Sequence, residues 1–305
     1  MKSTSEQADA LLHTVGVRAR DDLRVLRLKG DDQRIWLNGQ VTSDVRHTKA
    51  GDAVYGLAVN VKGRVLTDLW VLDEGAALLV LLPESTLQTV RESLERQIIM
   101  EDVELAIDEH TRVLSAQGPR AAAACAGLEH VYPCAELVDA GCFVLVSAPD
   151  RDAQLAALTA AAEREQGCAV DEAGFTLARM RVGRPSLGLD FGERAYPQEA
   201  GLKGLAVSFN KGCYLGQEVV CTLEHRGKLS RRLVRLESID GSGSIGDELA
   251  DSTGQTIGQI TSCATETASG QTLALGYAKM AHALEGHELR APHGRFLVRG
   301  TAGKD

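Results

Sequence analysis

The sequence is poor in several features that would mark a specialised class of protein. Aromatic side chains make up 4% of its 305 residues, so the core must be built mostly from leucine, valine and alanine. The net charge is −9, which argues against broad binding to nucleic-acid phosphates. No apolar run is long enough to span a bilayer, and the N-terminus lacks the apolar segment of a secretory signal. We therefore expect a cytoplasmic protein that binds neither membranes nor nucleic acid directly.

Cysteine is present but carries no familiar pattern. Seven cysteines lie at wide spacings, and none forms a Cys-x-x-Cys pair, which argues against a zinc knuckle or a thioredoxin-type centre. An odd number of cysteines in a chain of this length also disfavours a disulfide framework. We expect reduced thiols, most of them buried as small apolar side chains, and no metal site.

The apolar pattern predicts a mixed α+β fold in three parts. In residues 1–116, strand-like runs at 23–28, 53–60, 64–72 and 76–82 are separated by helical stretches at 31–45 and from residue 83 onward, and Gly63 ends a hairpin turn. Residues 117–228 form a second α+β unit, which includes a long loop rich in glycine and proline at 183–211. From residue 229 to 305, short strands between glycine-rich turns predict a small β-barrel.

The octapeptide Lys211–Glu218, Lys-Gly-Cys-Tyr-Leu-Gly-Gln-Glu, is the strongest candidate for a functional site. A lysine ammonium close to Cys213 would lower the pKa of the thiol and raise its reactivity. Gln217 and Glu218 could cap the following turn or bind a ligand. The alternative, from the residues alone, is a buried structural cysteine at the start of a helix.

The octapeptide, with Val219-Val220 and His225-Arg-Gly227 after it, resembles the signature of the YgfZ-type folate-binding proteins, which are related to the aminomethyltransferase (T-protein) of the glycine cleavage system. The resemblance extends over nearly the whole chain. Further segments are similar to family motifs: Leu37–Asp44, the hairpin Asn60–Leu69, Arg179–Asp190 with its Gly-x-Pro pattern, Pro197–Gly201 and Val207–Phe209.

This resemblance implies a cloverleaf of two α+β subdomains and a C-terminal barrel around a folate channel. It also implies an accessory protein for iron–sulfur cluster assembly or repair that binds tetrahydrofolate and contacts iron–sulfur proteins or assembly factors. Cys213 would be the functional thiol, and Asp68 would act at the folate. The implied folate contacts are Asn38, Thr42, Asp44, Arg181, Glu199, Lys211, Tyr214, Gln217, Glu218 and Arg226.

The chain departs from the related enzymes at two positions. The aminomethyltransferase hairpin carries Asp-Asp, where this chain has Thr67-Asp68. Two residues after the arginine of the Gly-x-Pro pattern, those enzymes place a glutamate that binds the pterin, where this chain has Arg181. A guanidinium only donates hydrogen bonds, whereas the amino edge of a pterin needs an acceptor. Glu199 is a candidate replacement.

Other interpretations remain open at this point. Asp68 is also compatible with a solvent-facing position, and Asn38, Thr42 and Asp44 with helix-cap and turn roles. The chain could be a folate-dependent one-carbon transferase that uses Asp68, or a folate-free scaffold. The basic residues from His225 to Arg235 could dock a glutamate tail or an acidic partner, or form a solvated hinge. We expect a monomer.

Overall fold

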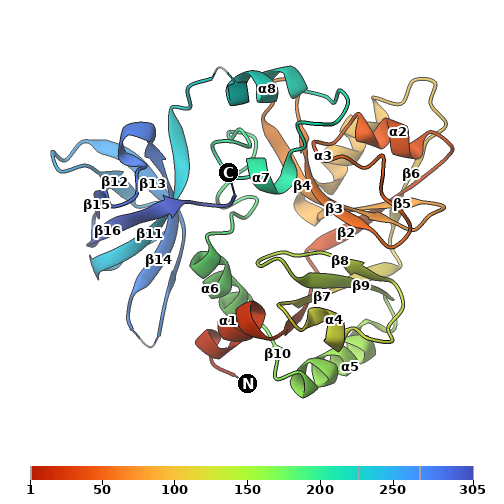
Figure 1. Ribbon diagram of the computed structural model, residues 1–305, viewed down its shortest axis with the longest axis horizontal. Helices are drawn as coiled ribbons and strands as arrows, with labels where there is room; N and C mark the ends of the chain where they lie inside the picture. The colour runs from red at the N-terminus through yellow and green to blue at the C-terminus, as the bar shows by residue number, and fades with distance from the viewer. Residues whose placement is uncertain (1, 226, 268, 305) are drawn as a thin grey trace.

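The computed structural model describes residues 2–225, 227–267 and 269–304, and it consists of three lobes joined by long connecting segments (Figure 1). No helix in this described part is both long and apolar enough to cross a membrane. Two lobes are built on five-stranded sheets and the third is a closed six-stranded barrel. The α+β fold class predicted from the sequence is confirmed.

The first lobe is a sheet in the order β3-β4-β5-β2-β6 with helices on its outer face. Its central strand is wholly apolar, and its side chains alternate between two cores: Leu78, Val80 and Leu82 face one, Leu79 and Leu81 the other. The two-residue period of a strand therefore places apolar residues on both faces of the sheet. The elements are β2 (Leu23–Lys29), α2 (Gln33–Asn38), β3 (Ala53–Val59), β4 (Val65–Asp73), β5 (Leu78–Pro83), α3 (Glu84–Glu95) and β6 (Glu104–Asp108).

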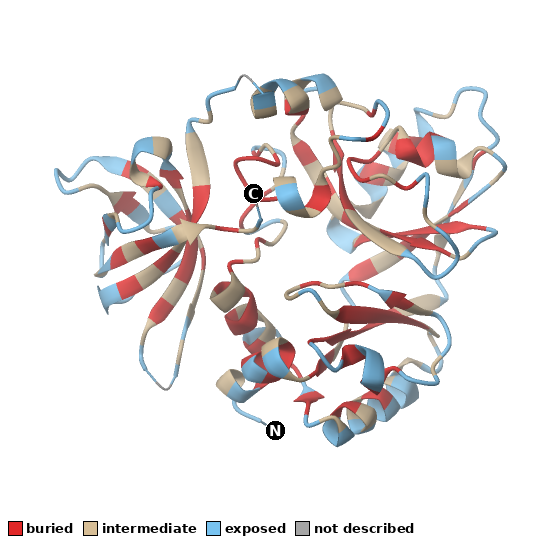
Figure 2. Cartoon of the chain, in the orientation of Figure 1, coloured by how far each residue is buried: buried red, intermediate tan, exposed pale blue. Residues whose placement is uncertain are grey.

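The second lobe packs its sheet, in the order β10-β1-β7-β9-β8, against the inner face of the first. Phe143 and Leu145 meet Leu79 and Leu81 in this shared core, and most of β7 and β9 is buried (Figure 2). Helices α4 and α5 cover the outer face. The elements are α1 (Thr4–His13), β1 (Gly16–Ala19), β7 (Thr111–Gln117), α4 (Ala121–Ala124), β8 (Val131–Pro133), β9 (Gly141–Ser147), α5 (Arg151–Arg164), β10 (Cys168–Ala169) and α6 (Glu172–Val182).

The barrel closes because β11 pairs with both β14 and β16. Two short helices, α7 (Lys203–Ala206) and α8 (Gln217–His225), lie in the segment that leads to it. The barrel elements are β11 (Arg231–Gly241), β12 (Glu248–Ala250), β13 (Thr256–Thr265), β14 (Thr272–Lys279), η1 (Met280–His282), β15 (Glu288–Ala291) and β16 (Gly294–Thr301).

The sheets divide the chain differently from the predicted boundaries at 116 and 228. Strand β1 belongs to the second sheet, where it pairs with β7 and β10, so residues from both predicted units form one lobe. The segment that carries the cysteine motif packs on the first lobe, since Tyr214 lies in one core with Leu57 and Val59. Helix α2 ends at Asn38 rather than near residue 45, because the side chains of Asn38 and Thr42 accept the backbone N–H groups of Val45 and Leu57.

Candidate functional site

A cavity of about 770 Å³ lies where the two sheets meet the long loop that follows α6. The first lobe contributes Tyr55, Asp68 and Trp70, and the loop contributes residues 184–188. The second lobe contributes Arg18, Arg20, Glu136 and Phe175. Cavities of this size and mixed polarity are typical of small-molecule sites.

Asp68 lies on β4 with its carboxylate in this cavity. The Tyr55 hydroxyl donates a hydrogen bond of 2.8 Å to its Oδ2 atom, and the Arg184 guanidinium stacks over the Tyr55 ring at 4.7 Å. Burial raises the pKa of Asp68, although the Tyr55 hydroxyl and the charge of Arg184 partly oppose this. Asp68 is half-buried in the cavity wall, and its carboxyl group takes up a proton more readily than an exposed aspartate.

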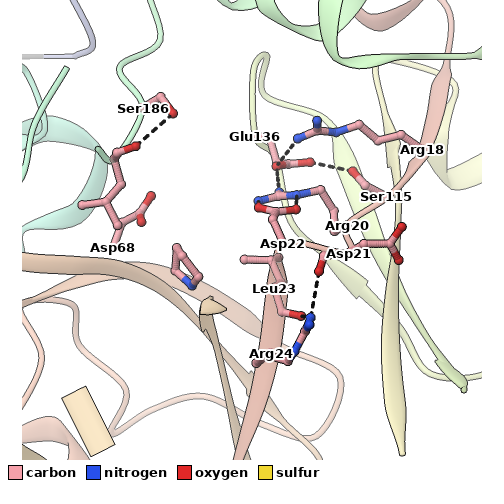
Figure 3. A network of polar contacts seen from close by, with 12 residues as sticks. Arg18, Arg20, Asp21, Asp22, Leu23, Arg24, Asp68, Ser115, Glu136 and Ser186 are labelled. Atoms are coloured by element: carbon pink, nitrogen blue, oxygen red, sulfur yellow. Dashed lines mark hydrogen bonds and ion pairs between the residues drawn. The ribbon is translucent and has the colours of Figure 1, made fainter. Parts of the chain in front are cut away.

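The opposite wall is built from charges that hold one another in place (Figure 3). Arg20 forms an ion pair with Glu136 and a two-bond contact with Asp22, at 2.8 and 2.9 Å. Ser115 donates to Glu136 at 2.6 Å, and Arg18 stacks on Phe175 at 3.5 Å. This wall therefore presents a fixed array of donors and acceptors to the cavity.

The cysteine motif lies outside the lining of this cavity. The Lys211 ammonium is buried and donates three hydrogen bonds of 2.6 Å, to the carbonyl oxygens of Asn38, Val41 and Ser43. Burial lowers the pKa of Lys211 to about 8. An ammonium has three donors, so none remains for the Cys213 thiol. Lys211 therefore holds the 38–43 loop through its three hydrogen bonds.

The thiol of Cys213 is exposed, which rules out the buried structural cysteine. The residues around it are anchored: Tyr214 is buried in the core, and the Leu215 amide donates to the Gly39 carbonyl at 3.0 Å. Gly216 has φ +78°, and a Cβ there would lie 2.3 Å from the Asn60 carbonyl oxygen. The motif thus projects one thiol from a rigid turn.

The remaining motif residues begin helix α8. Gln217 is its first residue and is half-buried, while Glu218 is exposed in its first turn. A carboxylate in this position is favourable for the helix dipole. Arg226, the last of the predicted folate contacts in this region, lies outside the described residues.

The 38–44 loop serves the structure as the cap-and-turn interpretation predicts. Thr42 is fully buried, and its hydroxyl donates to the Ala206 carbonyl at 2.6 Å while it accepts from the Leu57 amide at 2.9 Å. Asp44 forms an ion pair with Arg46 at 2.7 Å, and the hydrogen bonds from Arg46 lower the pKa of Asp44 to about 2. These contacts, together with Lys211, fix the loop.

Arg181 and Glu199 also lie outside the cavity lining, and both join lobes. Arg181 forms ion pairs with Asp9 at 2.7 Å and Glu266 at 2.6 Å, so it ties α6 to α1 and to the barrel. Glu199 is buried between Arg64 at 3.4 Å and Arg231 at 3.6 Å. The charges of both residues are used in these contacts.

Asp68 is therefore the one predicted site residue, among those that the structure describes, that lines the cavity. Sequence reasoning missed Tyr55, Arg184, Arg20 and Glu136. Arg184 lies within the matched Gly-x-Pro segment, and Tyr55 lies on the strand that pairs with β4. The sequence therefore offered a clue that these two residues lie near the site. Arg20 and Glu136 are 116 residues apart and had none. Within the described ranges, His, Cys, Asp and Glu form no group of three placed to hold a metal ion.

Comparisons with known proteins identify similar chains. Residues 1–134 match the family model described as "GCVT N-terminal domain". The chain is 28% identical over 232 residues to the tRNA-modifying protein YgfZ of Serratia proteamaculans (strain 568). This alignment covers 72% of this chain and 70% of the relative. The YgfZ protein of Yersinia enterocolitica (serotype O:8, biotype 1B) is 27% identical over 75% of this chain and 73% of its own length.

The fold has a close counterpart among solved structures. The aminomethyltransferase T of the glycine cleavage system from Bartonella henselae superposes with a TM-score of 0.84 at 19% identity, over 98% of this chain and 88% of that one. These matches confirm the resemblance and the cloverleaf fold expected from the sequence motifs.

The Lys211 contacts predict a large loss of stability on Lys211→Met. The substitution removes the donor from three buried carbonyl groups, and we expect the free energy of unfolding to fall by about 3 kcal/mol. The control is Lys62→Met, at an exposed lysine on the hairpin, which should change it by less than about 0.5 kcal/mol. Urea denaturation measures both. Equal stability of the two variants would contradict the structural role of Lys211.

Proposed function

We propose that this relative of the YgfZ proteins, with the fold of an aminomethyltransferase, binds tetrahydrofolate or a related reduced folate in the cavity that Asp68 lines. We further propose that it acts as an accessory protein in iron–sulfur cluster assembly or repair, with Cys213 as its functional thiol. The observation that carries the folate proposal is a half-buried carboxylate, hydrogen-bonded to Tyr55, in a cavity of about 770 Å³.

The lining of the cavity supplies what a pterin and its linker require. The rings of Tyr55, Trp70 and Phe175 offer apolar faces for a flat heterocycle. The carboxylates of Asp68 and Glu136 accept hydrogen bonds, as an amino-pyrimidine edge needs. Arg181 is not available for this task because it is paired with Asp9 and Glu266. We therefore propose that the hydrogen-bond acceptor for the pterin edge is a carboxylate within the cavity.

The iron–sulfur proposal is supported by the exposed thiol and by the intact motif around it. The names of the relatives refer to tRNA modification. Because this chain carries a net charge of −9, direct binding of tRNA phosphates is disfavoured. In this proposal the protein supports tRNA modification indirectly, by assisting a partner enzyme. It acts as a cytoplasmic monomer. The alternative is that it serves as a scaffold and binds no folate.

Tryptophan fluorescence tests folate binding directly. The chain has two tryptophans, and in Trp36→Phe the remaining Trp70 lines the cavity. We expect tetrahydrofolate to quench Trp70, and Asp68→Asn in that background to weaken binding at least tenfold. Since burial raises the pKa of Asp68, binding should weaken as the pH falls through this raised pKa, and Asp68→Asn should remove that dependence.

The matched control is Asp139→Asn, at an exposed aspartate outside the cavity lining, which should bind like the parent. The absence of quenching and of a calorimetric signal with tetrahydrofolate would eliminate the folate proposal and leave the scaffold alternative.

A second candidate, one-carbon transfer to tetrahydrofolate, is favoured by the raised pKa of the half-buried Asp68 in a fold shared with an aminomethyltransferase. A carboxyl group of raised pKa can exchange a proton with a reacting nitrogen. If this activity exists, methylene transfer from an aminomethylated carrier should be robust in the parent and lost in Asp68→Ala. No transfer above the uncatalysed rate would remove the candidate.

The role of Cys213 is tested by complementation. In a strain that lacks the gene, Cys213→Ser should fail to restore the activity of iron–sulfur enzymes, because serine keeps the shape but loses the thiolate. Cys221→Ser, at a half-buried cysteine on α8, should restore it. Full complementation by Cys213→Ser would refute the thiol proposal without touching the folate site.

A further inference from the structure

An exposed apolar patch lies on the first lobe, on α2 and on the loop between α3 and β6. Ile35 of α2 is 75% exposed, and the consecutive loop residues Ile99 and Met100 are 83% and 92% exposed. Figure 1 shows this loop beside α2, and none of the three residues lines the central cavity. Single exposed apolar side chains are common, whereas several gathered on one surface are typical of an interaction site.

The loop is fixed to α2 at both of its ends. The indole Nε1 atom of Trp36 donates to the Gln97 carbonyl at 3.3 Å, and the Asp102 amide donates to the Asp32 carboxylate at 2.9 Å. Ile35 lies between Asp32 and Trp36 in the chain. The three apolar residues of this α2–loop patch therefore belong to two segments that are held together, and a surface fixed in advance loses little conformational entropy on binding.

The conformation of the loop itself is fixed by Glu101. Its Oε2 atom accepts hydrogen bonds from the Ile99 and Met100 amides at 2.9 and 3.0 Å. These two hydrogen bonds lower the pKa of Glu101, so the carboxylate stays ionised at neutral pH. Both apolar side chains are thus presented to solvent from a structured turn that carries a negative charge.

The rim of the patch is acidic. Four carboxylates lie in the two segments that carry it: Asp31, Asp32, Glu101 and Asp102. Within the described ranges of the chain, none of the four forms an ion pair. Arg34 is paired with the buried Asp73 at 2.6 Å, which leaves Arg96 as the exposed cation of these segments. The rim therefore keeps an excess of negative charge.

We propose that the α2–loop patch is a docking surface for a basic, amphipathic segment of a partner protein. The apolar side chains of such a segment would cover Ile35, Ile99 and Met100, while its lysine or arginine side chains would pair with the carboxylates of the rim. A second copy of this chain fits less well, because a two-fold contact would bring two identical acidic rims together. An anionic membrane surface is disfavoured for the same reason.

Methyl NMR of the full chain, labelled with ¹³C at the methionine methyl groups, tests this proposal. The probe is a synthetic amphipathic peptide of leucine and lysine. We expect a saturable shift of the Met100 methyl signal, which Met100→Leu identifies by its loss. The signals of Met180, which is buried on α6, and of Met280 in the barrel should stay unchanged.

Substitutions at exposed positions separate the patch from general attraction. Ile99→Ser should weaken peptide binding about tenfold, because it removes a central apolar contact, whereas Leu284→Ser, at a 58% exposed leucine of the barrel, should bind like the parent. Asp31→Asn should weaken binding and reduce its dependence on salt, whereas Asp139→Asn, at an exposed aspartate of the second lobe, should do neither.

Equal weakening by Ile99→Ser and Leu284→Ser would overturn the proposal, since it would show a general attraction of basic peptides to an acidic protein. Absence of saturable binding at low salt, or binding that leaves the Met100 signal unchanged, would also overturn it. A dimer of this chain in sedimentation that Ile99→Ser dissociates would assign the patch to a second copy instead. These measurements use neither folate nor the Cys213 thiol, so they are independent of the proposed function.

Discussion

The barrel is held against α6 and the long loop by a buried ion pair, between Arg179 on α6 and Asp190 in the long loop. The two side chains are 2.5 Å apart and almost fully buried. Arg179 also donates to the Ser262 hydroxyl of the barrel at 2.9 Å, and Asp190 accepts from the Thr261 hydroxyl at 2.6 Å. Helix, loop and barrel thus meet at two charges that must stay paired, because an isolated buried charge costs several kcal/mol.

The same pair sets the shape of the central cavity. Arg179 donates to the Arg184 carbonyl at 3.1 Å, and Asp190 accepts from the Ser186 amide at 2.9 Å. The loop is therefore held at Arg184 and at Ser186, and the Arg184 side chain comes to lie over Tyr55. The environment of Asp68 is a consequence of packing between lobes, not of its own strand alone.

This explains which parts could be predicted from the sequence. The central strands and the barrel were predictable, because the alternation in β4, the continuous apolar run of β5 and the glycine-rich turns after residue 229 are local signals. Motifs also drew attention to Asp68, which lines the cavity, and to Cys213, which is exposed. The membership of β1 in the second sheet could not be predicted, because this four-residue strand pairs with partners more than 90 residues away. Chain order alone carries no such information.

The residues predicted to form one site lie apart in the structure for a related reason. Lys211, Arg181 and Glu199 are charged residues in family motifs, and such residues suggest ligand contacts. Each is used instead to join segments distant in sequence, through carbonyl groups or opposite charges. The cavity takes its opposite wall from Arg20 and Glu136, whose pairing emerges only when two sheets pack face to face. A motif can therefore mark the framework of a site rather than its lining.

The unequal burial of the seven cysteines has a practical consequence. Four are buried, two are half-buried, and Cys213 is the one that is exposed. Because an accessible thiol reacts with alkylating reagents far faster than a buried one, the native chain carries a natural attachment point at its cysteine motif. A dye or spin label could be placed there without removing any other cysteine, and would report on the turn that Lys211 and Tyr214 anchor.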